Sequence, residues 1–173
     1  MLRRGRLIVP VVALGLMLGS GPPADETAIA ERLARVRDIH GAAGPWAVVG
    51  HRIGERALKG LGLPRHSFSI LVVHHAPAQV QYSCVADGLQ AATGASPGKL
   101  NLRVEEASAE NLSTVIKDRK TGRTLTFTLR PAFVRSISDL PHGRLEVEGR
   151  RVAGLRDDEM FSVAESKSPA ADR

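Results

Sequence analysis

Apolar positions in the first half of the chain follow helical spacing twice. Within residues 24–40 they recur along one helical face, at Ile29, Leu33, Val36 and Ile39. A second helical pattern runs from Trp46 to about Leu61, after Pro45, which suits a first helical position. Its small residues would allow close packing against a sheet or another helix: Ala47, Gly50, Gly54 and Ala57. The sequence therefore predicts two helices separated by a turn that begins at Gly41.

The pattern then changes to a continuous apolar run. Residues 68–73 read FSILVV, which predicts a buried central strand with His74 and His75 at its C-terminal end. Ser83 is a favourable N-cap residue and Gly94 a favourable residue after a helix C-terminus. We therefore expect a third helix that starts at Ser83 and ends at Gly94.

Strand spacing dominates the next part of the chain. Three stretches are expected to be strands: 101–107, 112–117 and 124–129. The segment 118–123 predicts a hairpin turn between the last two of them. Beyond Pro131 the pattern weakens, and residues 164–173 are expected to form a disordered tail.

The expected order is helix, helix, strand, helix and three strands. This order predicts an α+β fold in which helices pack on one mixed β-sheet. A length of 173 residues allows one ordinary domain, and we assign residues 25–163 to it.

Residues 1–24 have the parts of a secretory signal peptide. Arg3, Arg4 and Arg6 precede an apolar run from Leu7 to Leu18, and small and turn-forming residues follow. The run is shorter than the ~20 residues that a membrane-spanning helix needs. We therefore predict export to the periplasm or the extracellular space. An uncleaved N-terminal anchor is the alternative, and it would be the only attachment to a membrane.

The signal segment also accounts for half of the net charge. The whole chain carries 24 basic and 18 acidic residues, a net charge of +6, and the first 24 residues contain three arginines and no acid. The remaining charge of +3 is interspersed, and there are one Trp, one Tyr and four Phe to stack on bases. Nucleic acid is not an expected partner.

The single cysteine, Cys84, is the first candidate for chemistry. The expected helix would place it in the first turn, where the helix dipole favours a thiolate, with Asp87 three residues later on the same face. An unpaired thiol in an oxidising compartment suggests a task, such as a catalytic nucleophile. A buried and inert cysteine is the alternative.

Histidines are the second candidates. His40, His51, His74 and His75 could join Cys84 as ligands of a borderline metal such as zinc. Neighbouring residues of a strand point to opposite faces, so at most one of His74 and His75 would face a site. For each histidine, a structural role is the alternative.

Two segments resemble motifs of the FmdE family, which takes its name from a component of formylmethanofuran dehydrogenase. Residues 40–52, HGAAGPWAVVGHR, resemble the family segment HGHxxP…G-[YH]-R. Residues 83–94, SCVADGLQAATG, resemble SCxxDGIQxxTG, and 98–101 continue as Gly-Lys-Leu-Asn, with Lys99 near the expected site. The resemblance implies an α-β-α-β-β-β core with a mixed sheet.

The family resemblance also implies a metal site, to which zinc is often assigned. His40, Cys84 and Asp87 stand at matching positions, whereas Ala42 replaces the second histidine of HGH and Gly44 a frequent cysteine. The C-terminal zinc finger of longer members is absent from this sequence. If a metal binds, His51, His74 or His75 would complete its ligand set.

The leading hypothesis is an exported FmdE-like domain in an accessory or redox-related role. It would bind zinc, another divalent transition metal or a small molecule through His40, Cys84, Asp87 and His74. One alternative is a small hydrolase or lyase with Cys84 as thiolate nucleophile and a nearby histidine as base. Another is a metal-free binding or dimerisation module, and a homodimer is compatible with each.

Overall fold

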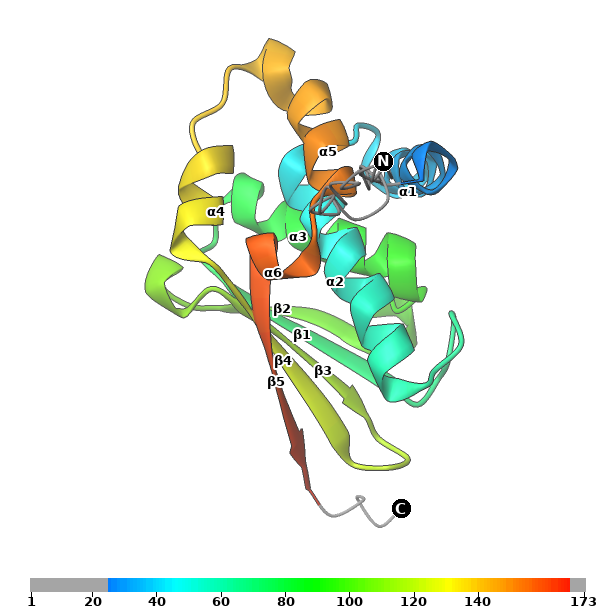
Figure 1. Ribbon diagram of the computed structural model, residues 1–173. Coiled ribbons are helices and arrows are strands. Elements are labelled where there is room, and N and C mark those ends of the chain that lie inside the picture. The colour runs from blue at the N-terminus through cyan, green and yellow to red at the C-terminus, as the bar shows by residue number, and fades with distance from the viewer. Residues whose placement is uncertain (1–24, 169–173) are drawn as a thin grey trace, which may run out of the picture.

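The computed structural model describes residues 25–168 (Figure 1). The predicted signal peptide, 1–24, and residues 169–173 lie outside the described residues. The helices are α1 (Glu26–His40), α2 (Pro45–Leu61), α3 (Val80–Thr93), α4 (Pro131–Ile137), α5 (Leu145–Gly154) and α6 (Asp157–Met160). The strands are β1 (Ile70–Ala76), β2 (Leu102–Glu106), β3 (Ser113–Asp118), β4 (Arg123–Leu129) and β5 (Phe161–Lys167). Short 3₁₀ turns cover Pro97–Lys99, Ala109–Asn111 and His142–Arg144.

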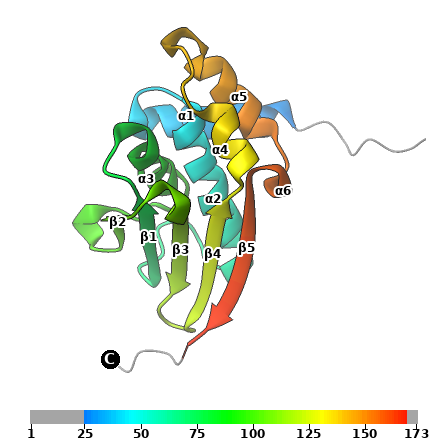
Figure 2. The same ribbon diagram turned by 90° about the vertical axis from the view of Figure 1, so that its left-hand side faces the viewer.

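The strands form one mixed sheet in the order β2-β1-β3-β4-β5, which Figure 2 shows side by side. β1 and β2 run parallel and are joined through α3, whereas the other neighbours are antiparallel. One row across the sheet is apolar and buried: Leu102, Val72, Ile116 and Leu125. α2 and α3 pack over the sheet and cover this row (Figure 1). The α+β prediction with one mixed sheet is confirmed.

α2 and α3 approach each other closely because glycines face the neighbouring backbone. A Cβ atom at Gly88 would lie 1.8 Å from the carbonyl oxygen of Ala47, and one at Gly50 would lie 2.1 Å from that of Val85. No side chain can occupy either position without a shift of the backbone. The close packing expected from the small residues of the second helix is confirmed.

The starts of two elements differ from the sequence prediction. β1 starts at Ile70, and Phe68 is 72% exposed, so the run of apolar letters extends beyond the buried strand. α3 starts at Val80 and not at Ser83, whose hydroxyl donates to the carbonyl oxygen of Val80 (3.0 Å). A serine that bonds back into its own helix does not cap it.

The C-terminal part is more ordered than its pattern predicted. α4, α5 and α6 follow the hairpin, and β5 then pairs with β4 over 161–167 at the edge of the sheet. The tail prediction is therefore wrong for 164–167. Along β5 only Phe161 is buried, so the strand lacks the alternation of buried apolar and exposed polar residues by which a strand is predicted from sequence.

None of the helices in the described part of the chain is long and apolar enough to cross a membrane. Export is a prediction from residues 1–24, which lie outside the described residues.

We predict that the fold loses stability in mild acid because His51 and His74 are buried. Burial lowers the pKa of each from 6.5 to about 4. The unfolded chain therefore takes up these protons first as the pH falls below 6.5, and stability is lost between pH 6.5 and about 4. The expected loss from pH 7 to pH 5 is about 2 kcal/mol per histidine, measured by urea unfolding.

A His51→Leu variant should show a weaker pH dependence over this range than the unmodified protein. Exposed His142 provides the matched control, since His142→Ala should leave the dependence unchanged. Equal free energies of unfolding at pH 7 and pH 5 would contradict the prediction.

Candidate functional site

The end of α1 meets α3 through one polar contact. His40 Nδ1 lies 2.7 Å from Asp87 Oδ2, and the side chains are 24% and 46% exposed. An ionised carboxylate only accepts hydrogen bonds, so Nδ1 carries the proton. In the neutral ring this leaves the lone pair on Nε2, which can accept a hydrogen bond or bind a metal.

The loop after His40 is fixed by α5. Gly41 has φ +83° and its N–H donates to the carbonyl oxygen of Arg37 (2.8 Å), which ends α1 as predicted. Glu146 of α5 accepts from the N–H of Ala43 (2.8 Å) and from the side chain of Arg37. These bonds lower the pKa of Glu146, and the bond from Arg37 has the largest effect. They hold the chain on both sides of His40.

His40 and Asp87 line a cavity of about 330 Å³ between α3 and β2. Cys84 lines the same cavity, together with Val80, Ser83, Ala86, Gln90, Pro97, Leu102, Arg103 and Val104. The three residues of the FmdE-like motifs that were matched to a metal site therefore share one pocket. Most of its remaining wall is apolar, and ligand pockets commonly combine apolar walls with a few polar groups.

The electrostatic environment of Cys84 is the reverse of the predicted one. Because α3 starts at Val80, Cys84 lies beyond the first turn, where the helix dipole has little effect. Burial raises the pKa of the thiol, and the negative charge of Asp87 raises it further. The thiol is therefore protonated near neutral pH, whereas an activated cysteine nucleophile is a thiolate.

His74 is not available to this pocket. Its side chain is buried, Nε2 donates to the carbonyl oxygen of Tyr82 (3.2 Å), and Nδ1 accepts from the hydroxyl of Thr114 (2.9 Å). His75 points to the other face of the sheet, as predicted, with Nδ1 3.6 Å from Glu105 Oε2. Both histidines thus have structural partners.

Two other candidates also lie away from the cavity. His51 is 1% exposed, and neither of its ring nitrogens has a hydrogen-bond partner among the described residues. Lys99 donates from Nζ to the carbonyl oxygen of Gly94 (2.7 Å) and lies over the ring of Phe68. Neither side chain lines the pocket.

The predicted metal-ligand set is therefore assembled only in part. His40, Cys84 and Asp87 line the same cavity, whereas His74 does not line it and bonds to Thr114 and Tyr82 instead. Within residues 25–168, no group of three or more His, Cys, Asp or Glu side chains is placed to hold a metal ion.

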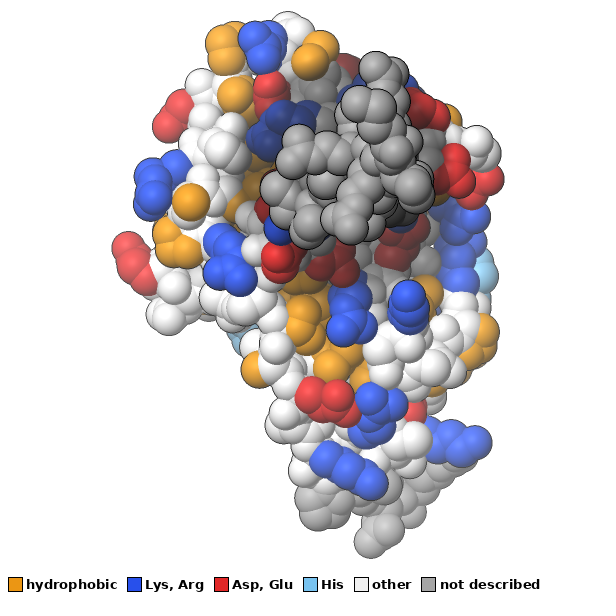
Figure 3. Space-filling view, in the orientation of Figure 1, with side chains coloured by type: hydrophobic (Ala, Val, Ile, Leu, Met, Phe, Trp, Pro, Cys, Tyr) orange, Lys and Arg blue, Asp and Glu red, His pale blue; other side chains and the backbone are white. Residues whose placement is uncertain are grey.

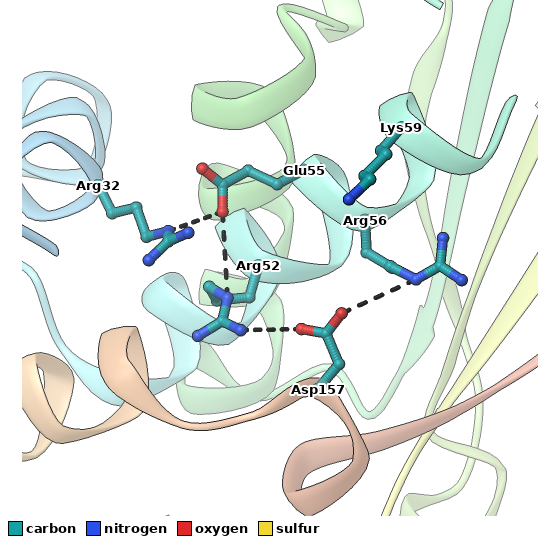
Figure 4. A pocket seen from close by; sticks show the side chains of 6 residues that line it. All are labelled: Arg32, Arg52, Glu55, Arg56, Lys59 and Asp157. Atoms are coloured by element: carbon teal, nitrogen blue, oxygen red, sulfur yellow. Dashed lines mark hydrogen bonds and ion pairs between the residues drawn. The ribbon is translucent and has the colours of Figure 1, made fainter. Parts of the chain in front are cut away.

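A second cavity, of about 490 Å³, is lined only by charged side chains: Arg32, Arg52, Glu55, Arg56, Lys59 and Asp157 (Figure 4). Arg32 binds Glu55 (2.7 Å), and Arg52 binds Asp157 (2.8 Å). Both arginines also donate to the carbonyl oxygen of Ala153, at 3.2 and 2.8 Å. The pairs join α1 and α2 to the end of α5 and to α6, which is a structural role. No pattern along the chain indicated this network.

Figure 3 shows basic and acidic side chains interspersed among the described residues of the face that it draws.

Comparisons with known proteins agree with this fold. Residues 39–168 match the family described as "FmdE, Molybdenum formylmethanofuran dehydrogenase operon". No curated protein matches the sequence. Among solved structures, the chain is similar to the crystal structure of a tungsten formylmethanofuran dehydrogenase FmdE-like protein from Syntrophus aciditrophicus. The TM-score is 0.52 at 19% identity, over 86% of this chain and 79% of that one, and this likeness concerns the fold alone.

We predict that the charge of Asp87 lowers the reactivity of Cys84, in addition to the effect of burial. Replacement of its charge in Asp87→Asn should lower the pKa of the thiol, because a negative neighbour disfavours the thiolate. The rate of alkylation by iodoacetamide should then rise at a lower pH than in the unmodified protein. Cys84 is the only cysteine, so the measurement reports this thiol alone.

Gln90→Ala is the matched control, since it changes the lining of the cavity without changing its charge. An alkylation midpoint that is the same in Asp87→Asn as in the unmodified protein would contradict the assignment.

Proposed function

Because the chain belongs to the FmdE family, we propose that it is a binding domain that holds a small molecule in the cavity beside His40, Cys84 and Asp87. The observation that carries the proposal is the 2.7 Å contact between His40 Nδ1 and Asp87 Oδ2, two side chains that line this cavity. The contact orients the imidazole before any ligand arrives, which lowers the entropy cost of binding.

The lining indicates the class of ligand. His40 Nε2 presents an acceptor, so the ligand carries an N–H or O–H donor, such as an amine or a hydroxyl. Val80, Leu102 and Val104 form an apolar part of the wall, which suits a ligand whose remaining part is aliphatic or aromatic. A cavity of about 330 Å³ is at the small end of the range for ligand pockets, so the ligand is a small molecule.

The state of Cys84 favours binding over nucleophilic catalysis. A neutral thiol is a weak nucleophile and behaves as a small, polarisable apolar group. Burial and the charge of Asp87 both raise its pKa. The hydrolase or lyase alternative requires a thiolate at neutral pH.

Zinc or another divalent transition metal is the ligand that the family resemblance implies. For such an ion the pocket offers Nε2 of His40 and Sγ of Cys84, while Asp87 is already bonded to Nδ1. Catalytic zinc sites use three protein ligands and structural sites four. The described residues do not fit that requirement, so no step of the proposed function relies on a metal.

We predict that small aliphatic amines and alcohols bind beside His40. Amide NMR of the purified protein should show shifts at Cys84 and at its neighbours on α3 when members of such a panel are added. His40→Ala should weaken the best binder about tenfold, because one hydrogen bond to an oriented acceptor is lost.

His142→Ala, at an exposed position, is the control and should leave the affinity unchanged. If every member of the panel fails to shift the resonances of the cavity, or binds His40→Ala equally well, the proposed site is wrong.

We also predict less than one equivalent of zinc per chain in the purified protein. Elemental analysis should give the same low content for the unmodified protein and for Cys84→Ser, since no three His, Cys, Asp or Glu side chains of the described residues are placed to hold the ion. One zinc per chain that is lost in Cys84→Ser would instead establish a metal site and overturn the metal-free proposal.

A further inference from the structure

The cavity lies next to a free edge of the sheet. β2 is the first strand in the sheet order and pairs only with β1 within the described residues. Leu102, Arg103 and Val104 of this strand also line the cavity. An edge strand with unpaired backbone groups is a ready partner for another strand.

We propose that β2 is the interface between two copies of this chain, paired antiparallel and centred on Val104. The proposal concerns a surface beyond the proposed ligand site and does not require a ligand. A second copy of β2 would extend the sheet across a two-fold axis perpendicular to it, as in an isologous dimer.

The charges of β2 select this register. With such an axis, one residue of the strand must lie opposite its own copy. If Arg103 were at the centre, it would face the partner's Arg103, and if Glu105 were at the centre, it would face the partner's Glu105. With Val104 at the centre, each Arg103 faces the partner's Glu105, and all five residues of β2 overlap. Opposite charges directly across two strands stabilise the pairing, whereas like charges destabilise it.

Apolar side chains at this edge are exposed in the single chain. Val80 is 80% and Val104 45% exposed, and both line the cavity. Leu100, just before β2, is 86% exposed. Exposed apolar groups that gather at one place mark interaction surfaces. Pairing of the β2 edges would cover Val104 and bring the second copy of the chain toward Val80 and Leu100.

The proposed symmetry also closes the ligand site. An axis perpendicular to the sheet keeps the helices of both copies on the same side. Since Val104 lies at the axis and lines the cavity, the two cavities of the dimer would face each other there. Each copy would then form part of the wall around its partner's site.

Charge reversal with rescue tests the interface. Sedimentation equilibrium of the purified protein should show a dimer. Arg103→Glu and Glu105→Arg alone should each weaken dimerisation about tenfold or more, because each places like charges opposite one another twice. The double variant, Arg103→Glu with Glu105→Arg, should restore the dimer, since the two charges exchange places.

Arg103 and Glu105 already form an ion pair within one strand (2.6 Å), so the control variant must break a similar pair away from the proposed interface. Arg156 and Asp158 form an exposed pair with the same sequence spacing (3.0 Å), so Arg156→Glu should leave the dimer intact. Circular dichroism verifies that each variant is folded. A monomeric unmodified protein, a dimer that survives both single reversals, or a folded double variant that stays monomeric would each overturn the proposal.

Discussion

The close contact between α2 and α3 fixes the geometry on which the site depends. Because Gly50 and Gly88 lack side chains, each helix lies against the backbone of the other. On α3 the contacts with α2 are made by Val85 and Gly88. Cys84 directly precedes the first of them and Asp87 the second, so the positions of both follow from the way the two helices cross. A methyl group at Gly88 would meet the carbonyl oxygen of Ala47 at 1.8 Å and force α3, with Asp87, away from α2. Packing at two glycines thus determines whether a carboxylate reaches His40.

A second close approach places the other half of the site. A Cβ atom at Gly149 of α5 would lie 1.7 Å from the carbonyl oxygen of Ala43. Glu146, one turn earlier on α5, accepts from the N–H of Ala43. The loop after α1 is therefore clamped against α5 by packing and by a charged acceptor, and His40 is held where α1 ends. The contact between His40 and Asp87 joins two elements that are each fixed independently.

The sequence predicted the first helices and the central sheet because these follow short-range rules, whereas His40, Cys84 and Asp87 were matched to one site through the resemblance to the FmdE motifs. Helical spacing, the turn glycine Gly41 and strand alternation are local signals. The start of α3 was missed because Ser83 looks like a cap, although its hydroxyl bonds back to Val80. β5 was missed because only one of its residues is buried. The role of His74 depends on Tyr82 and Thr114, a three-dimensional arrangement that no spacing along the chain reveals.

Asp87 gives the pocket its chemical character through two effects with one cause. Its negative charge holds the proton of His40 on Nδ1 and so presents Nε2 as an acceptor. The same charge, added to burial, raises the pKa of Cys84 and keeps the thiol neutral. Thiolate attack would need the opposite arrangement, with a positively charged side chain or a general base beside the sulfur. Burial and the carboxylate that orients the histidine therefore together make the cysteine a poor nucleophile, and both effects suit a pocket that holds a donor group and leaves it unchanged.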